Sequence, residues 1–304
     1  MAGKITRRSF LKQCALLAGG LLGGGVLGPL TVEASANPDI FVVHGTDYYH
    51  NTIKAVEGLG GMGRIVSRGA KVGLLVNHAF LNLGAHVHPD MTVAVAAMCL
   101  DAGAKEVVLI KDPPWGYYRR ARSGDNVPDV IRKLKSPSGD YKKVPIHGAL
   151  VLKQAEIMKD LLECDVLVNT AIVKSHSATF ISAVLKNMMG SAPFSTCSRF
   201  HTGGWIKDDP DYLARCIADI NLVRKPDLCV MDATEVLATG GPYGPGLVKR
   251  PHQVFAGRDP VAVDALATRL LGLDQESILM LDFAAQHGLG QKDLSRVRIK
   301  EIKA

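Results

Sequence analysis

The sequence has few cysteines and no arrangement of them that would hold a cofactor. Six cysteines occur in 304 residues, and no two are spaced as Cys-x-x-Cys. One of them, Cys14, lies in residues 1–36, and the other five are scattered. This pattern excludes an iron–sulfur cluster held by a local cysteine run, and it is not that of a disulfide framework. We expect most of these thiols to be buried as small apolar side chains, with one disulfide as the alternative.

The apolar run near the start of the chain is short for a membrane span. Residues 16–30 carry no charge but many glycines, whereas a spanning helix needs roughly 20 apolar residues. The run follows Thr6-Arg7-Arg8-Ser9-Phe10-Leu11-Lys12 and precedes Ala34-Ser35-Ala36. Paired arginines, a short apolar stretch and a small-residue cleavage site are typical of a twin-arginine export signal cleaved after Ala36. A plain membrane-anchor helix is the alternative.

This signal predicts the domain organisation and the location of the protein. Residues 1–36 would be the signal peptide, and residues 37–304 would form a single large domain, long enough for a substantial core. The twin-arginine translocase would deliver it to the periplasm or the cell exterior, and an uncleaved signal would tether it to the membrane. This route moves folded proteins, so it is compatible with a bound cofactor without requiring one.

Residues 37–304 have only a small positive net charge and few aromatic residues. The formal net charge is +7, and four basic residues and one acidic residue within 1–36 account for +3 of it. Aromatic residues make up 6% of the chain, and no basic patch is interleaved with them. We therefore expect no nucleic-acid partner. A P-loop is excluded too, because no glycine-rich stretch continues into Gly-Lys-Ser/Thr.

Strand-like and helix-like segments alternate along residues 37–304. An apolar run at 71–76 is followed by a helical pattern from Pro89 that ends before Gly103, and then by a second strand at 106–110. This order predicts an α/β fold with a mostly parallel sheet flanked by helices. The other predicted elements are helices at 155–162 and 180–189, helices starting at Asp209-Pro210 and Asp259-Pro260, the latter ending at Gly272, strands at 165–168 and 228–231, and a surface excursion over 115–143.

Polar side chains follow the predicted strand at 165–168. In parallel sheets ligands bind beyond the carboxyl ends of the strands, and a helix N-terminus attracts anions. Asn169, Lys174, Ser175 and His176 would form a loop leading into such a helix, with Lys186 and Asn187 near its end. The alternatives are a solvated loop, and a lysine that stabilises the helix C-terminus.

Two other strand ends carry groups suited to chemistry. Asp232 and Glu235 follow the strand at 228–231 and lead to a glycine-rich stretch, 240–246, in which Gly241 would let a backbone approach a ligand. Carboxylates at a strand end could bind a metal ion or act in general acid–base catalysis. The alternative is a turn-rich connection with one capping aspartate. His86 and His88, preceded by Asn77-His78, could place two imidazoles on one side of an extended chain for a metal.

For some of these residues a structural role is equally open. His88 could merely precede the helix that Pro89 begins. Asp259 is expected to cap its helix. Asp264, in the first turns of that helix, is expected to be solvated rather than to point at the site.

The same residues resemble the family known as domain of unknown function 362. His88-Pro89-Asp90 and residues 102–107 are similar to its opening strand–helix–strand unit, and Asp112-Pro113 resembles its Asp-Ser-Pro turn. Its central signature is matched by Asn169, by Lys174-Ser175-His176 and by residues 186–190, although Ala171-Ile172 stand where the family often has Pro-Lys. Its later blocks are matched by His201, Asp232, Gly241-Pro242 and residues 259–264. Many members of this family carry ferredoxin-type cysteine clusters or accompany proteins that do. The resemblance therefore implies a ferredoxin-type redox partner.

Two functions therefore stay open at this point. The first is an enzyme linked to redox or metal-cofactor chemistry, in which Lys174 and Lys186 hold an anion, His176 binds a metal or moves protons, and Asp232 acts as base or metal ligand. Asn169, Ser175, Asn187 and Gly241 would complete the ligand site. The second is a non-catalytic binding protein or carrier for a small anionic ligand or cofactor. A structural subunit of an exported redox complex is a third alternative.

Overall fold

The computed structural model describes residues 37–122, 127–202 and 209–304, all within one compact unit. The predicted export signal, with its arginines and cleavage site, lies outside the described residues. In the described part of the chain, no helix has the length and apolar character needed to cross a bilayer. The five cysteines there are unpaired, and four of them are buried, as expected from their scattered spacing.

One large sheet organises the molecule. Its strands lie in the order β12 (Ile299–Lys303), β1 (Ile40–His44), β11 (Gln253–Gly257), β9 (Leu228–Leu237), β7 (Val166–His176), β2 (Lys71–Val76), β3 (Glu106–Leu109) and β4 (Leu134–Lys135). Along this path only β11 is antiparallel to its neighbours. Two short strands, β8 (Phe180–Ser182) and β10 (Val248–Lys249), pair antiparallel to β7 and β9. The prediction of a mostly parallel sheet is confirmed.

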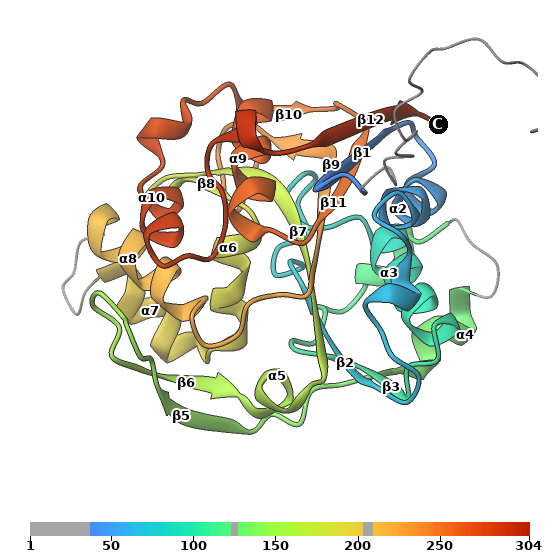
Figure 1. Ribbon diagram of the computed structural model, residues 1–304, viewed down its shortest axis with the longest axis horizontal. Coiled ribbons are helices and arrows are strands. Elements are labelled where there is room, and N and C mark those ends of the chain that lie inside the picture. Colours follow the sequence, from blue (N-terminus) through green and yellow to red (C-terminus); the bar gives the residue numbers. More distant parts are fainter. Residues whose placement is uncertain (1–36, 123–126, 203–208) are drawn as a thin grey trace, which may run out of the picture. The chain divides into compact units, whose positions relative to one another are not determined.

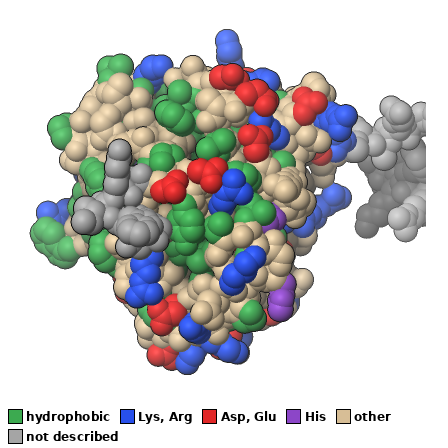
Figure 2. All heavy atoms as spheres, turned by 90° about the vertical axis from the view of Figure 1, so that its left-hand side faces the viewer, with side chains coloured by type: hydrophobic (Ala, Val, Ile, Leu, Met, Phe, Trp, Pro, Cys, Tyr) green, Lys and Arg blue, Asp and Glu red, His purple; other side chains and the backbone are tan. Residues whose placement is uncertain are grey.

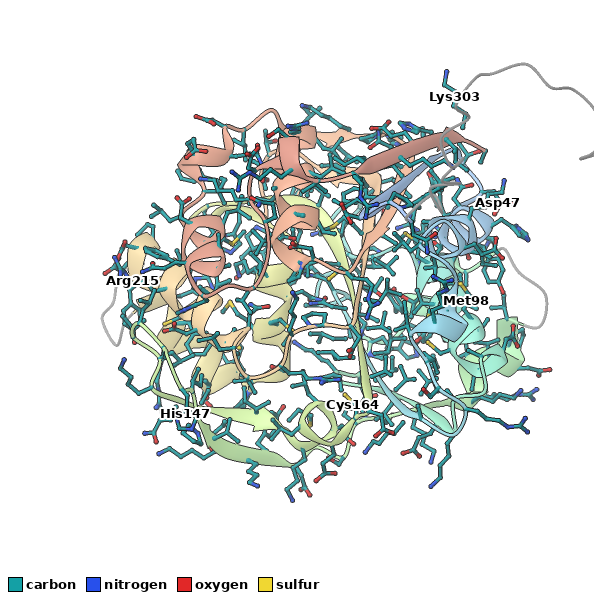
Figure 3. All side chains as sticks on the ribbon, in the orientation of Figure 1. Asp47, Met98, His147, Cys164, Arg215 and Lys303 are labelled. Carbon is teal, nitrogen blue, oxygen red and sulfur yellow. The ribbon has the colours of Figure 1, made fainter. Side chains whose placement is uncertain are left out.

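Helices cover both faces of this sheet (Figure 1). One face carries α2 (Tyr48–Glu57), α3 (Pro89–Asp101) and α4 (Val127–Lys133). The other carries α6 (Val184–Asn187), α7 (Phe194–Thr202), α8 (Pro210–Ile220), α9 (Pro260–Leu271) and α10 (Leu279–Gln286). Short 3-10 helices are η1 (Met62–Arg64), η2 (Tyr117–Arg120), η3 (Met188–Ser191), η4 (Gln275–Ser277) and η5 (Leu294–Arg296). The labelled Met98 on α3 and Arg215 on α8 mark the two opposite layers in Figure 3.

Each face of the sheet has its own hydrophobic core. Because side chains alternate along a strand, Leu75 and Leu167 pack toward α6, α8, α9 and α10. Leu74 and Val168 point the other way and pack toward α2 and α3. The outer surface of the α7, α8 and α10 layer carries acidic, basic and hydrophobic side chains interspersed (Figure 2). A three-layer α/β domain results, in which the central strands are buried on both sides.

Helices with strong local end signals form where they are predicted. The Asp259 carboxylate accepts hydrogen bonds from the amides of Val261 and Ala262, and Gly272 ends α9 in the left-handed conformation. Asp209 caps α8 in the same way. A side-chain N-cap followed by proline depends only on neighbouring residues, which explains why it can be read from the sequence.

The predicted helix at 155–162 is wrong. This stretch is divided between β6 (Gln154–Met158) and the short helix α5 (Lys159–Glu163). β6 pairs antiparallel with β5 (Tyr141–Pro145), so the predicted surface excursion supplies its partner strand. The stacked apolar pairs that indicated a helix are also compatible with a strand edge that alternates between exposed and buried side chains.

The strands predicted at 165–168 and 228–231 are too short, and this changes the site. β7 continues to His176 and β9 to Leu237, because each hydrogen-bonds to the other well beyond its apolar start. Lys174, Ser175 and His176 therefore lie on a strand and not in a loop. The helix predicted at 180–189 is replaced by β8, α6 and η3.

Candidate functional site

A cavity of about 690 Å³ lies at the carboxyl ends of the central strands. Asn77 and His78 follow β2, Lys111 follows β3, and Lys174 and His176 end β7. Further lining residues come from α6, η3, α7 and the glycine-rich stretch. The residues of this second group are Lys186, Asn187, Met189, Gly190, Cys197, Ser198, His201, Pro242 and Tyr243. The cavity therefore has the position expected for a ligand site in a parallel sheet.

The charge of the lining is of one sign. Three lysines and three histidines face the cavity, and the described lining contains no aspartate or glutamate. They are Lys111, Lys174, Lys186, His78, His176 and His201. Aromatic side chains, among them Phe80 and Tyr243 with ring centroids 4.5 Å apart, supply the apolar part. Such a lining suits a small molecule that combines an anionic group with an apolar or planar body.

Lys174 is the most deeply buried of the three lysines. Its side chain is 2% exposed, and its Nζ donates hydrogen bonds to the carbonyl oxygen of Ala85 at 2.6 Å and to Oδ1 of Asn77 at 3.2 Å. Burial, with a further contribution from the Lys186 charge, lowers the pKa of Lys174 to about 7. Lys174 is therefore balanced between its charged and neutral forms near neutral pH.

His176 is held in one neutral form. Its Nδ1 accepts hydrogen bonds from the backbone amides of Ala178 at 3.1 Å and Thr179 at 3.4 Å. The proton of the neutral ring must then sit on Nε2. Burial, followed by the charges of Lys186, His201 and Lys174, lowers the pKa of His176 to about 2. His176 thus offers the cavity a hydrogen-bond donor rather than a base.

His78 is held in one neutral form as well. Its Nε2 donates to the carbonyl oxygen of Lys111 at 3.0 Å, which leaves Nδ1 as an acceptor. Nδ1 is buried and has no hydrogen-bond partner within the described part of the chain. Burial lowers the pKa of His78 to about 4, so the ring is neutral. His78 is therefore a neutral ring that lines the cavity, with Nδ1 enclosed by the protein.

Asn169 and Asn187 hold the wall of the cavity together. Nδ2 of Asn187 donates to Oδ1 of Asn169 at 2.7 Å, and Nδ2 of Asn169 donates to the Val184 carbonyl at 3.1 Å. Asn187 lines the cavity, whereas Asn169 is fully buried beneath it. The two amides tie α6 to β7, so Asn169 supports the site without facing a ligand.

Asp264 occupies the helix N-terminus that was expected to attract a ligand anion. The carboxylate accepts hydrogen bonds from the amides of Val184 at 2.8 Å and Leu185 at 2.9 Å. The side chain is fully buried, so the expectation of a solvated Asp264 is wrong. Burial raises the pKa of Asp264 to about 7. The anion at the start of α6 is thus a group of the protein itself.

Ser175 and Gly241 join the glycine-rich stretch to the end of β7. The Gly241 amide donates to Oγ of Ser175 at 3.1 Å. A Cβ atom on Gly241 would lie 1.8 Å from the Ser175 carbonyl oxygen. The absence of a side chain at Gly241 therefore allows a close approach to strand β7 and not to a ligand. This contact positions Pro242 and Tyr243 at the cavity.

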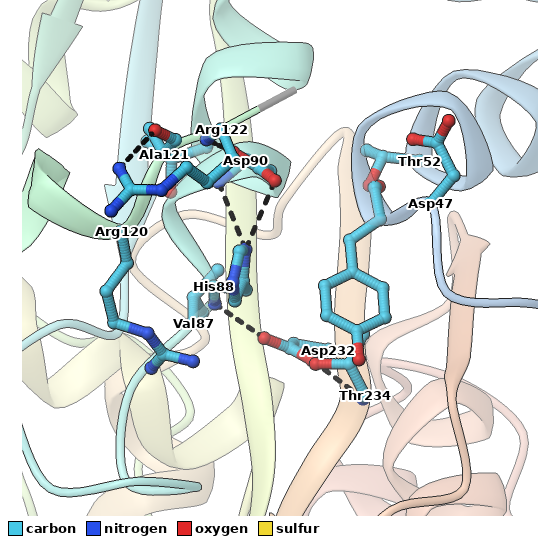
Figure 4. A network of polar contacts seen from close by, with 12 residues as sticks. Asp47, Thr52, Val87, His88, Asp90, Arg120, Ala121, Arg122, Asp232 and Thr234 are labelled. Carbon is cyan, nitrogen blue, oxygen red and sulfur yellow. Dashed lines mark hydrogen bonds and ion pairs between the residues drawn. The ribbon is translucent and has the colours of Figure 1, made fainter. Parts of the chain in front are cut away.

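Asp232 belongs to a polar network with His88 and Thr234 (Figure 4). Its Oδ2 accepts from the His88 amide at 2.6 Å, and its Oδ1 accepts from the amide and hydroxyl of Thr234. Burial raises the pKa of this carboxyl, although these donors oppose the shift. Asp232 does not line the cavity and instead attaches the loop to β9. The same loop reaches Lys174 through the Ala85 carbonyl.

His86 and His88 take part in this network as well. The Asn82 carbonyl accepts from Nδ1 of His86 at 3.1 Å, and Nε2 lies 3.2 Å from Nη1 of Arg120, so both ring nitrogens are engaged. His88 is the N-cap of α3 and accepts from the Asp90 amide. The structure thus favours the alternative in which His88 begins the helix.

The donor set of the cavity fits a metal ion poorly. No group of three or more histidine, cysteine, aspartate or glutamate side chains in the described ranges could hold one. Nε2 of His176 carries the proton, because two amide donors face Nδ1, and a ligating nitrogen needs a free lone pair. No step through a metal follows from this geometry.

Some cavity residues were not selected from the sequence. The sequence could have indicated Lys111, because it follows strand β3 in the same way as Asn77 and His78 follow β2. His201 lies in a block of the resemblance but received no role, and its ring centroid is 5.5 Å from that of His176. Nothing in the sequence around Cys197 indicated a site, because only the fold brings this residue of α7 to the cavity.

A comparison with family models identifies the family of this chain. The model described as "Domain of unknown function (DUF362)" matches residues 72–269. A thylakoid-associated protein of Synechocystis sp. is 24% identical over 239 residues, which cover 77% of this chain and 73% of that protein.

Two solved structures show fainter likeness. The lactate racemase apoprotein from Thermoanaerobacterium thermosaccharolyticum has a TM-score of 0.44 at 12% identity over 73% of this chain. A protein from Thermotoga maritima has a TM-score of 0.35 at 13% identity over 80% of this chain. The chain spans 55% and 60% of the lengths of these two proteins.

Proposed function

The chain belongs to the domain of unknown function 362 family, and from this premise we propose that its cavity binds a small molecule carrying a phosphate or carboxylate group. One observation supports this most: Lys111, Lys174 and Lys186 line one cavity whose described lining has no acidic side chain. An anion that enters the cavity would meet a positive electrostatic potential and charge-assisted hydrogen bonds from this lining.

The neutral His176 supplies orientation for this ligand. Nδ1 of His176 accepts from two backbone amides, so Nε2–H is the donor that the ring can offer to a ligand. A ligand with a carbonyl oxygen beside its anionic group would use this donor. Catalysis by a redox or metal cofactor is not part of this proposal, and the ferredoxin-type partner stays a prediction.

We expect inorganic phosphate to stabilise the protein and Lys186→Ala to weaken that effect. A ligand at one hundred times its Kd raises the free energy of unfolding by roughly 2.7 kcal/mol. Removing one cation from the cavity should raise the Kd about tenfold, equivalent to about 1.4 kcal/mol. The measurement is a thermal-shift titration with phosphate at constant ionic strength.

Lys105→Ala is the matched control for this titration. Lys105 is exposed and precedes β3, at the opposite end of the strand from Lys111. The variant removes the same charge but should keep the phosphate affinity of the wild type. Equal losses in Lys105→Ala and Lys186→Ala, or no stabilisation by phosphate at all, would contradict an anion site in the cavity.

We also propose that residues 1–36 direct export by the twin-arginine translocase. The supporting features are Arg7 and Arg8, the uncharged stretch after them and the small residues before position 37. A relative named as thylakoid-associated is consistent with a place at or beyond a membrane. Arg7→Lys with Arg8→Lys should abolish export, whereas Lys4→Arg should not. Cell fractionation with mass determination of the exported form tests this; export of the double variant at the normal level would refute it.

A further inference from the structure

Lys174 occupies an unusual position for a lysine. It lies on a buried strand, it lines the cavity, and in the described part of the chain no carboxylate forms an ion pair with it. Its two hydrogen-bond partners are uncharged oxygens, the Ala85 carbonyl and the Asn77 amide. The Phe80 ring lies 5.2 Å from Nζ. A lysine that served only as a structural cation would be expected to have a carboxylate partner at this depth.

The hydrogen bonds around Nζ match a neutral amine. A neutral amine has two N–H groups and one lone pair, and the two uncharged acceptors take the two N–H groups. The lone pair is then left without a partner from this set. Burial and the charge of Lys186 from α6 favour this form, and the neighbouring neutral rings of His176 and His86 bring no negative charge to oppose it. A buried amine beside another cation is the usual arrangement of a nucleophilic lysine.

We propose that Lys174 is a nucleophile that forms an imine with the aldehyde or ketone carbon of an anionic carbonyl compound. This inference rests on the anion-binding function proposed above and adds the substrate class and the reacting atom. Nζ attacks the carbonyl carbon, and a C–N bond forms. The two amine protons leave with the carbonyl oxygen as water, and a C=N bond remains, so no oxidant or reductant is needed.

Other cavity groups suit this step. Lys174 and His176 are two positions apart on β7 and line the same cavity, so their side chains share one face of the strand. Nε2–H of His176 is the donor available to polarise the carbonyl oxygen. Lys111 and Lys186 would hold the phosphate or carboxylate group.

Pyridoxal 5′-phosphate, which carries an aldehyde and a phosphate, is a suitable probe. The full-length chain is incubated with it, treated with sodium borohydride to fix any imine, digested and mapped by mass spectrometry. We expect a saturable adduct on Lys174, at least tenfold above that on the exposed Lys105, with inorganic phosphate competing. The reaction rate at Lys174 should be half-maximal near pH 7 and level above pH 8. A rate that keeps rising tenfold per pH unit, as at an ordinary lysine, would overturn the proposal.

Two readouts on the wild type separate this inference from the binding function: the adduct map and the phosphate titration. Lys174→Arg cannot form the imine, so the adduct at position 174 should vanish in that variant. If phosphate stabilises the wild type and Lys174 stays unmodified, the imine is refuted and anion binding stands. If Lys174 is modified but phosphate neither competes nor stabilises, the anionic substrate class and the proposed function both fail. Should Lys174→Arg not fold, the wild-type map decides alone.

Discussion

Asp219→Ala is expected to lower the free energy of unfolding by about 4 kcal/mol or more. The Asp219 carboxylate accepts hydrogen bonds from the amides of Leu150, Val151 and Leu152 and from Nε2 of His287, all at 2.8 Å. Asp219 is fully buried. Its removal leaves these four donors, which are buried or partly buried, without their acceptor, and an unpaired buried donor costs roughly 1–3 kcal/mol. Urea denaturation with an unchanged m-value would measure the loss.

Asp211→Ala is the matched control on the same helix. Asp211 forms an exposed ion pair with Arg215 one turn away, which contributes about 0.5 kcal/mol or less. Asp219→Asn should fall between the two, because the amide can accept from some of the donors but its NH₂ group opposes the others. A loss below about 1 kcal/mol for Asp219→Ala would show that the loop at 148–152 relaxes and finds other acceptors.

Gly241→Ala is expected to weaken anion binding more than tenfold and to destabilise the fold by about 2 kcal/mol. The new Cβ would meet the Ser175 carbonyl oxygen at 1.8 Å and its Oγ at 2.7 Å, and both belong to the central strand β7. The glycine-rich stretch must therefore move away from β7. That motion breaks the hydrogen bond from the Gly241 amide to Ser175 and displaces Pro242 and Tyr243 from the cavity wall.

Gly63→Ala provides the comparison for this variant. A Cβ on Gly63 would have no neighbouring heavy atom within 4 Å, and its backbone is not in the left-handed region. This variant should keep both the stability and the phosphate affinity of the wild type. Phosphate titration by thermal shift, with urea denaturation beside it, measures both quantities; wild-type affinity in Gly241→Ala would mean that the glycine-rich stretch does not shape the cavity.

The strand predictions show where a local pattern stops being informative. The apolar residues 165–168 identify the start of β7 but not its length, because Asn169 and Lys174 look like loop residues in sequence. In the fold, Asn169 is satisfied by Asn187 and Val184, and Lys174 by Asn77 and Ala85, which come from far along the chain. Polar groups can enter a buried strand only when such distant partners exist.

The candidate site shows the same limit. The rule that ligands lie beyond strand ends selected Lys174, His176, Lys186 and Asn187, all of which line the cavity. It also selected Asp232, which follows its apolar run in the same way yet bonds to the loop at 77–88 outside the cavity. Strand register and the bulge of β7 against β9 separate these residues, and neither is encoded within a few neighbouring positions.

The sequence by itself determined the family, the α/β class and the helices with their own caps, because each depends on ordered motifs or on residues that touch within one turn. Only the tertiary structure decided that β7 carries Lys174 and His176 into a cavity, that Asp264 fills a helix N-terminus and that Gly241 packs on Ser175. These contacts join residues that are tens of positions apart. Their energies come from burial and from hydrogen bonds that exist only once the sheet has assembled.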